Sequence, residues 1–146
     1  YGDKVSAMER FCENFHRLPN SVKSRLTVEN DDKATMYSVK DLYEGVYCKI
    51  GIPIVFDYHH HRFCTGGLSE EDALEVAIST WGDIKPVVHY SESRNIEQED
   101  DKIRPQAHSD YVYDYIDTYG NEVDIMVEAK AKELAVLKYK EIHEVV

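Results

Sequence analysis

Acidic and imidazole side chains lie at or just past the ends of four β-rich segments of this sequence. In the segment Val55–Phe63, VFDYHHHRF, an aspartate (Asp57) and three consecutive histidines directly follow an apolar run. The remaining members of this set are Glu29, His89, His108 and Glu128. Carboxylates combined with neutral imidazoles suit Zn²⁺, Mn²⁺ or Fe²⁺, and several of each are enough for a cluster of ions. The residue types therefore predict a divalent-metal site.

The β-rich segments that must position these side chains alternate with helical patterns. They are Arg25–Asn30, Ile52–His59, Ile84–Ser91 and Val123–Lys130. Near-continuous apolar runs are typical of strands that are buried on both faces of a parallel sheet. Since parallel strands end on the same side of a sheet, we expect the acids and histidines at these ends to converge.

Helices are expected before, between and after these strands. The first carries an apolar stripe that includes Val5 and Met8, and the others are predicted at Ser38–Gly51, Ser69–Gly82, Asp110–Tyr119 and Ala131–His143. Ser38 and Ser69 are predicted N-caps, because each is followed three residues later by an aspartate. Strict alternation predicts an α/β fold of parallel β/α units. Four strands are half of a (β/α)₈ barrel, which needs ~250 residues.

Composition limits the class of protein. Charged residues make up 31% of the 146-residue chain, and no apolar run approaches the ~18 residues of a membrane span. We expect a globular, intracellular protein with reduced cysteines, in the cytoplasm or, in a eukaryote, the nucleus. The net charge of −11 disfavours a simple phosphate-binding protein, although bound cations would offset it. Much of the excess of acidic residues lies in Ser91–Lys102, which we expect to be a solvated loop. Because the helical pattern begins almost at Tyr1, we expect residues 1–146 to be a single domain or a fragment.

Each predicted ligand also has a structural alternative. Glu29 could cap a turn, and His89 and His108 could be hydrogen-bonded without binding metal. Asp57 would then need a buried partner such as an arginine. Among the three histidines, strand alternation puts Asp57 and His59 on one side, whereas a turn after the strand would bring Asp57 and His60 to one ion. The sequence does not choose between these two arrangements.

Five motifs, VEND, FDYHHHR, VVHYSES, AHSDY and DIMVEAKAKELA, together resemble the C-terminal half of the UV damage endonuclease family. More distantly, they resemble the apurinic-site endonuclease and xylose isomerase superfamily of TIM barrels. The resemblance implies the C-terminal half of a TIM (β/α)₈ barrel, with the N-terminal half elsewhere in the same parent chain. Val87 stands where the family usually has a lysine.

The resemblance also implies roles for individual residues. The implied ligands of up to three divalent ions, most commonly Mn²⁺, are Glu29, Asp57, His60, His89, His108 and Glu128. Catalytic roles fall on Glu29, Glu128 and His60. The expected contacts to substrate are His59, His61, Arg62 and Tyr90, and His59 and His61 could instead support the ligands.

The resemblance implies a metal-dependent DNA repair endonuclease, a hydrolase that cuts phosphodiester bonds of damaged double-stranded DNA. The parent protein is expected to be monomeric. Two alternatives remain open. A sugar isomerase or epimerase of the related barrels would need a proton-transferring group above the metals, for which Lys130 is the nearby strand-end lysine. The other is a non-catalytic half-barrel with an incomplete site.

Overall fold

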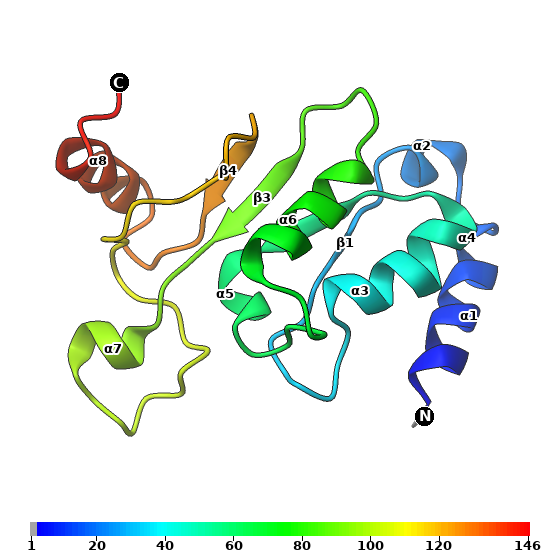
Figure 1. Ribbon diagram of the computed structural model, residues 1–146, viewed down its shortest axis with the longest axis horizontal. Helices are drawn as coiled ribbons and strands as arrows, with labels where there is room; N and C mark the ends of the chain where they lie inside the picture. The colour runs from blue at the N-terminus through cyan, green and yellow to red at the C-terminus, as the bar shows by residue number, and fades with distance from the viewer. Residues whose placement is uncertain (1–2) are drawn as a thin grey trace.

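The four strands form one parallel sheet in the order β1-β2-β3-β4. The structure is a computed structural model that describes residues 3–146, so Tyr1 and Gly2 of the predicted unit lie outside the described residues. The strands are β1 (Val28–Glu29), β2 (Ile54–Asp57), β3 (Val87–Tyr90) and β4 (Asp124–Val127). All three neighbouring pairs are parallel, which confirms the predicted α/β class. Figure 1 shows the sheet in the middle of the molecule, with the two ends of the chain at opposite sides.

Helices precede β1 and fill each connection, as the alternation predicted, although several are short. The longer ones are α1 (Lys4–Phe15), α6 (Glu70–Ser79) and α8 (Glu133–Ile142). The short ones are α2 (Asn20–Lys23), α5 (Tyr58–His61) and α7 (Arg94–Gln98). The predicted helix at Ser38–Gly51 is one run of three parts: α3 (Val39–Leu42), a π-helical turn η1 (Tyr43–Tyr47) and α4 (Cys48–Ile50). No helix within residues 3–146 is long and apolar enough to cross a membrane.

Local sequence explains where two of these helices begin. The Ser38 hydroxyl accepts a hydrogen bond from the Asp41 N–H, and the Asp41 carboxylate accepts one from the Ser38 N–H. Ser69 caps α6 through the Asp72 N–H. Such caps satisfy N–H groups that the first helical turn leaves free. Both predicted N-caps are therefore confirmed.

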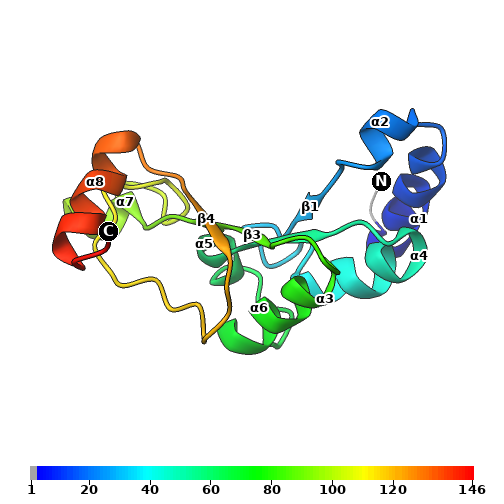
Figure 2. The same ribbon diagram turned by 90° about the horizontal axis from the view of Figure 1, so that it is seen from above.

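The core lies between the sheet and the helices α3 and α6, which cover the same face of it (Figure 2). Strand β2 is buried along its whole length, with Phe56 at its centre. The Ile54 N–H and C=O at its start bind the Thr80 hydroxyl and the Trp81 indole N–H, both at 2.8 Å. A central strand buried this completely is a rigid support for the residue at its end.

The predicted helix at Asp110–Tyr119 is wrong, because this segment is irregular. The carboxylates of Glu92 and Glu97 accept hydrogen bonds from its backbone N–H groups, Glu97 from Asp110 and Tyr111, and Glu92 from Tyr113 and Asp114. These bonds hold the backbone in a loop, and its Tyr, Asp, Val and Thr residues have low helix propensity.

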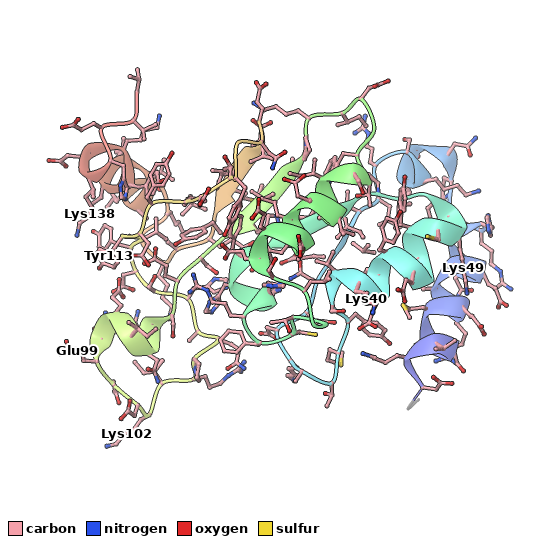
Figure 3. The ribbon with its side chains drawn as sticks, viewed as in Figure 1. Lys40, Lys49, Glu99, Lys102, Tyr113 and Lys138 are labelled. Atoms are coloured by element: carbon pink, nitrogen blue, oxygen red, sulfur yellow. The ribbon has the colours of Figure 1, made fainter. Side chains whose placement is uncertain are left out.

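The acidic segment Ser91–Lys102 was expected to be a solvated loop, and this is also corrected. It contains α7, and two of its carboxylates bind the 110–114 backbone instead of facing water. Helix α8 packs beside the loop Asp110–Tyr119. The Lys138 ammonium lies 4.5 Å from the ring centre of Tyr111 and 5.1 Å from that of Tyr113 (Figure 3).

Candidate metal centre

The fold brings the six predicted ligands to one end of the sheet. Glu29 and Asp57 are the last residues of β1 and β2, and His89 pairs in register with Asp57. Glu128 directly follows β4, where its N–H donates to the carbonyl of Tyr90. The remaining two are His60 on α5 and His108, which forms an antiparallel bridge with Ser93. Convergence at the carboxyl ends of parallel strands is what the sequence predicted.

The end of β2 determines which of His59 and His60 lies beside Asp57. The strand stops at Asp57 and α5 starts at Tyr58, so strand alternation no longer applies to the histidines. Asp57 is the N-cap of α5: its Oδ1 accepts from the His60 N–H at 2.8 Å. Its Oδ2 lies 3.7 Å from His60 Nε2. Capping therefore places the side chains of Asp57 and His60 next to each other.

The two glutamates each lie between two histidines. Glu29 is 3.3 Å from His60 Nδ1 through one oxygen and 3.4 Å from His89 Nδ1 through the other. Glu128 is 3.2 Å from His89 Nδ1 and 3.7 Å from His108 Nε2. Each glutamate therefore has both carboxylate oxygens directed at imidazoles of the cluster.

Two overlapping groups within this cluster have metal-ligand spacing. Glu29, Asp57 and His60 form one, and Asp57, His89 and Glu128 form the other, with the ligand atoms of each group within 4.8 Å of one another. Asp57 belongs to both. His108 belongs to neither and is connected to the second through Glu128.

Burial and neighbouring charges shift the proton affinities in the cluster. Burial raises the pKa of Asp57 to about 7, and the nearby Glu29 carboxylate adds to this shift. Burial would also raise the pKa of Glu29, but hydrogen bonding with His89 and Asp57 brings it below its ordinary value. The contact with Glu29 raises the pKa of His89. Burial lowers the pKa of His60, but the Asp57 charge, the Asn30 carbonyl and the Glu29 charge together outweigh it and leave the pKa raised. The cluster therefore holds extra protons that a cation would displace.

The side chains fit a divalent cation on two counts. Among residues 3–146, Asp57 Oδ2 is a buried atom without a hydrogen-bond partner, which is costly for a polar group. Within the same residues no arginine or lysine pairs with Asp57. The alternative in which Asp57 forms a buried ion pair instead of binding metal therefore has no partner for the carboxylate. Oxygen and imidazole donors of this kind suit Mn²⁺, Fe²⁺ or Zn²⁺. These groups could hold a metal.

The predicted substrate contacts lie around the cluster and differ in exposure. Arg62 is exposed at the end of α5, whereas Tyr90 is buried and donates its hydroxyl to Glu92 at 2.8 Å. His59 and His61 are buried as well. His59 Nε2 lies 3.2 Å from the Gln106 carbonyl, and burial lowers the pKa of His59 to about 4, so this ring is neutral at pH 7. Burial favours the supporting role for these two histidines over contact with phosphate.

Sequence reasoning missed Asn30, which is fully buried between β1 and β2 beside the cluster. Its side chain makes two hydrogen bonds to the backbone of Asp57. A polar residue directly after an apolar strand and a predicted ligand was the available signal, but its partners are 27 residues away.

Comparisons with known proteins agree with this geometry. The family model described as UV-endonuclease UvdE matches residues 1–145. The UV DNA damage endonuclease of Bacillus pumilus is 40% identical over 97% of the chain, and that of Bacillus mycoides is 37% identical over 94%. The crystal structure of SacUVDE superposes with a TM-score of 0.80 at 34% identity over 97% of the chain.

The matched part of each relative is about half of its length. The chain covers 45% of the Bacillus pumilus protein, 44% of the Bacillus mycoides protein and 47% of the SacUVDE chain. A half-barrel within a longer barrel protein was the expectation. Since the family model and the solved structure both match almost all of these residues, the chain belongs to the UV-endonuclease UvdE family.

Proposed function

We propose that this chain is the metal-binding C-terminal half of a DNA repair endonuclease that hydrolyses the backbone beside UV photoproducts and other lesions. The observation that carries the proposal is the pair of three-residue groups at the strand ends, which share Asp57. Relatives of about twice its length are named UV DNA damage endonucleases. The proposal includes an N-terminal half in the same parent chain that completes the barrel, so that residues 1–146 form one part of a larger unit.

In this proposal six side chains hold the ions: Glu29, Asp57, His60, His89, His108 and Glu128. Bound divalent ions would lower the pKa of a coordinated water and neutralise the charge that develops on the phosphate. Glu29 and Glu128 would hold the ions as carboxylate ligands, because each lies between two histidines. Asp57 contributes a buried oxygen to both groups, and His60 is held against it by the α5 cap. Strand-borne ligands keep this arrangement fixed during the reaction.

Finer features of the proposal concern the ions and the whole protein. We propose Mn²⁺ as the metal, with up to three ions in the complete barrel, because the resemblance to the UV damage endonuclease family implies it and the mixed imidazole and carboxylate donors are compatible with it. The parent enzyme is proposed to act as a monomer inside the cell, where its DNA substrate lies.

Damaged double-stranded DNA is the proposed partner. A base at a lesion leaves the stack at lower cost than an undamaged base, which exposes the adjoining phosphodiester to the cluster. Arg62 is placed to meet a phosphate at the rim, since it is exposed at the end of α5. Tyr90, His59 and His61 are buried and are proposed to contact substrate only indirectly, through the groups that they hold.

Nicking of supercoiled plasmid tests this function. UV-irradiated and undamaged plasmids are incubated with Mn²⁺ and either this chain or the longer parent protein. We expect the parent to nick only the irradiated plasmid, and Glu29→Gln in the parent to abolish nicking. The matched control is Asn121→Asp, whose side chain bonds Glu75 and the Thr118 carbonyl away from the cluster. Equal nicking of both plasmids, or full activity of Glu29→Gln, contradicts the proposal. Activity of the parent without activity of residues 1–146 shows that the cluster needs the other half to cut DNA.

A further inference from the structure

Asn30 is a buried, uncharged residue next to the cluster that contacts two of its members, Asp57 through its side chain and His60 through its backbone carbonyl. It directly follows Glu29, is 1% exposed and lies between β1 and β2. Its amide pairs with the backbone of Asp57 in both directions. Asn30 Nδ2 donates to the Asp57 carbonyl at 3.0 Å, and Asn30 Oδ1 accepts from the Asp57 N–H at 2.8 Å.

This pairing extends the sheet where β1 has already ended. The backbone ladder between β1 and β2 stops at the pair Glu29 and Val55. Two residues further along β2, the Asn30 amide supplies the donor and the acceptor that a neighbouring strand would otherwise supply. Buried backbone groups need such partners, because each unpaired one costs about 1–3 kcal/mol. The Asn30 side chain therefore connects the end of β2, including Asp57, to the end of β1.

The backbone of Asn30 acts on the second ligand. Its carbonyl oxygen lies 2.7 Å from His60 Nδ1. A carbonyl can only accept, so this bond requires the tautomer of the neutral ring with the proton on Nδ1, which the Glu29 oxygen 3.3 Å from the same nitrogen also favours. His60 Nε2 then presents its lone pair, and this nitrogen is the one that faces Asp57 Oδ2. Metal-binding histidines are commonly held in one tautomer by such a bond from the other ring nitrogen.

We propose that Asn30 is a positioning residue of the metal centre, which orients Asp57 through its amide and fixes the tautomer of His60 through its carbonyl. The inference rests on the proposed metal site and adds a residue that is not itself a ligand. Asparagine is required because an amide both donates and accepts. An aspartate would keep the acceptor, lose the donor and set a carboxylate against the Asp57 carbonyl.

Two measurements on the full chain test this role. The first is long-range ¹H–¹⁵N NMR of the His60 ring in the metal-free, unsubstituted chain at pH 9. We expect the tautomer with the proton on Nδ1. A ring with its proton on Nε2 overturns the inference, and this result needs no variant to fold.

The second measurement is calorimetric titration of Mn²⁺ into Asn30→Asp and Asn30→Ala. Loss of a group that orients a ligand typically weakens metal binding roughly 10- to 100-fold, and we expect that range for both variants. Asn121→Asp is the matched control, because it makes the same chemical change at an asparagine bonded to Glu75 and Thr118, and it should bind as the unsubstituted chain does. Folding is checked by circular dichroism.

Binding of Mn²⁺ by both folded Asn30 variants within about twofold of the unsubstituted chain overturns the inference, because the expected loss is at least tenfold. Failure of the unsubstituted chain to bind Mn²⁺ contradicts the proposed function instead, and the His60 tautomer then decides the positioning role alone. The two failures are therefore distinguishable.

Discussion

The ends of β2 and β4 both carry a carboxylate of the cluster, but the two are held differently. Asp57 is completely buried and is fixed by the α5 cap and by the two bonds of Asn30. The Glu128 side chain is 31% exposed, follows a strand whose first three residues are exposed, and has its two carboxylate oxygens near two histidines of the cluster. One half of the site is preorganised by the core, whereas the other half is held largely by the charged groups themselves.

The largest contrast is expected in folding stability. Phe56→Ala in β2 removes a fully buried ring and should lower the free energy of unfolding by about 3–5 kcal/mol. Met126→Ala in β4 changes a side chain that is 54% exposed and should alter it by less than about 0.5 kcal/mol. Urea denaturation of both variants measures the difference. Similar losses from the two substitutions would show that β4 is as well supported as β2.

Metal affinity should follow the same order. Asp57→Asn keeps an N-cap for α5 but removes the oxygen shared by both ligand groups, so we expect Mn²⁺ affinity to fall about 100-fold or more. Glu128→Gln removes a charge from one group only and should cost about tenfold. Isothermal titration calorimetry at pH 8 compares the two. A greater loss from Glu128→Gln would place the principal ligand at β4.

The Asp57→Asn substitution, which should weaken metal binding, should stabilise the metal-free chain. Because the pKa of Asp57 is raised to about 7, its protonated form favours folding, and this contribution is lost as the pH rises through about 7. At pH 8 the metal-free chain therefore carries a buried charge, and Asp57→Asn should be more stable by about 1–3 kcal/mol. Thermal unfolding in EDTA at pH 8 and pH 5 measures this. The gain should shrink at pH 5, and an equal gain at both pH values would exclude ionisation as its cause.

The smallest effect is expected from pH alone. His60 and His89 have raised pKa values in the metal-free chain, so protons compete with the ion as the pH falls. Mn²⁺ affinity should fall by roughly tenfold between pH 8 and pH 6. Equilibrium dialysis at constant ionic strength checks the trend, and affinity that is independent of pH over this range would exclude both imidazoles as ligands.

The sequence predicted well where the strands end, because each apolar run stops at a polar residue. In a parallel sheet, that residue belongs at the carboxyl end of its strand. Asp57 and His89 pair in register, as convergence requires. The choice of His60 over His59 could not be made in advance, since it depends on β2 ending at Asp57 and α5 beginning one residue later. An aspartate N-cap followed three residues later by the second ligand is a local signal for that arrangement.

Long-range polar contacts account for what the sequence did not predict. The segment Asp110–Tyr119 has the spacing of a helix, but Glu92 and Glu97 bind its backbone from 13 to 22 residues away along the chain. The role of Asn30 could not be predicted, because its partners lie on β2 and α5. Hydrophobic periodicity carries no information on such pairs.

The central claim is that the cluster at the strand ends is a metal centre. Its most direct test is the Mn²⁺ content of the unsubstituted chain, Asp57→Asn and Asn121→Asp after gel filtration at pH 8, measured by elemental analysis. We predict Mn²⁺ in stoichiometric amount in the unsubstituted chain and in Asn121→Asp, and a near-complete loss in Asp57→Asn. The same Mn²⁺ content in all three proteins, or none in the unsubstituted chain, would contradict the claim.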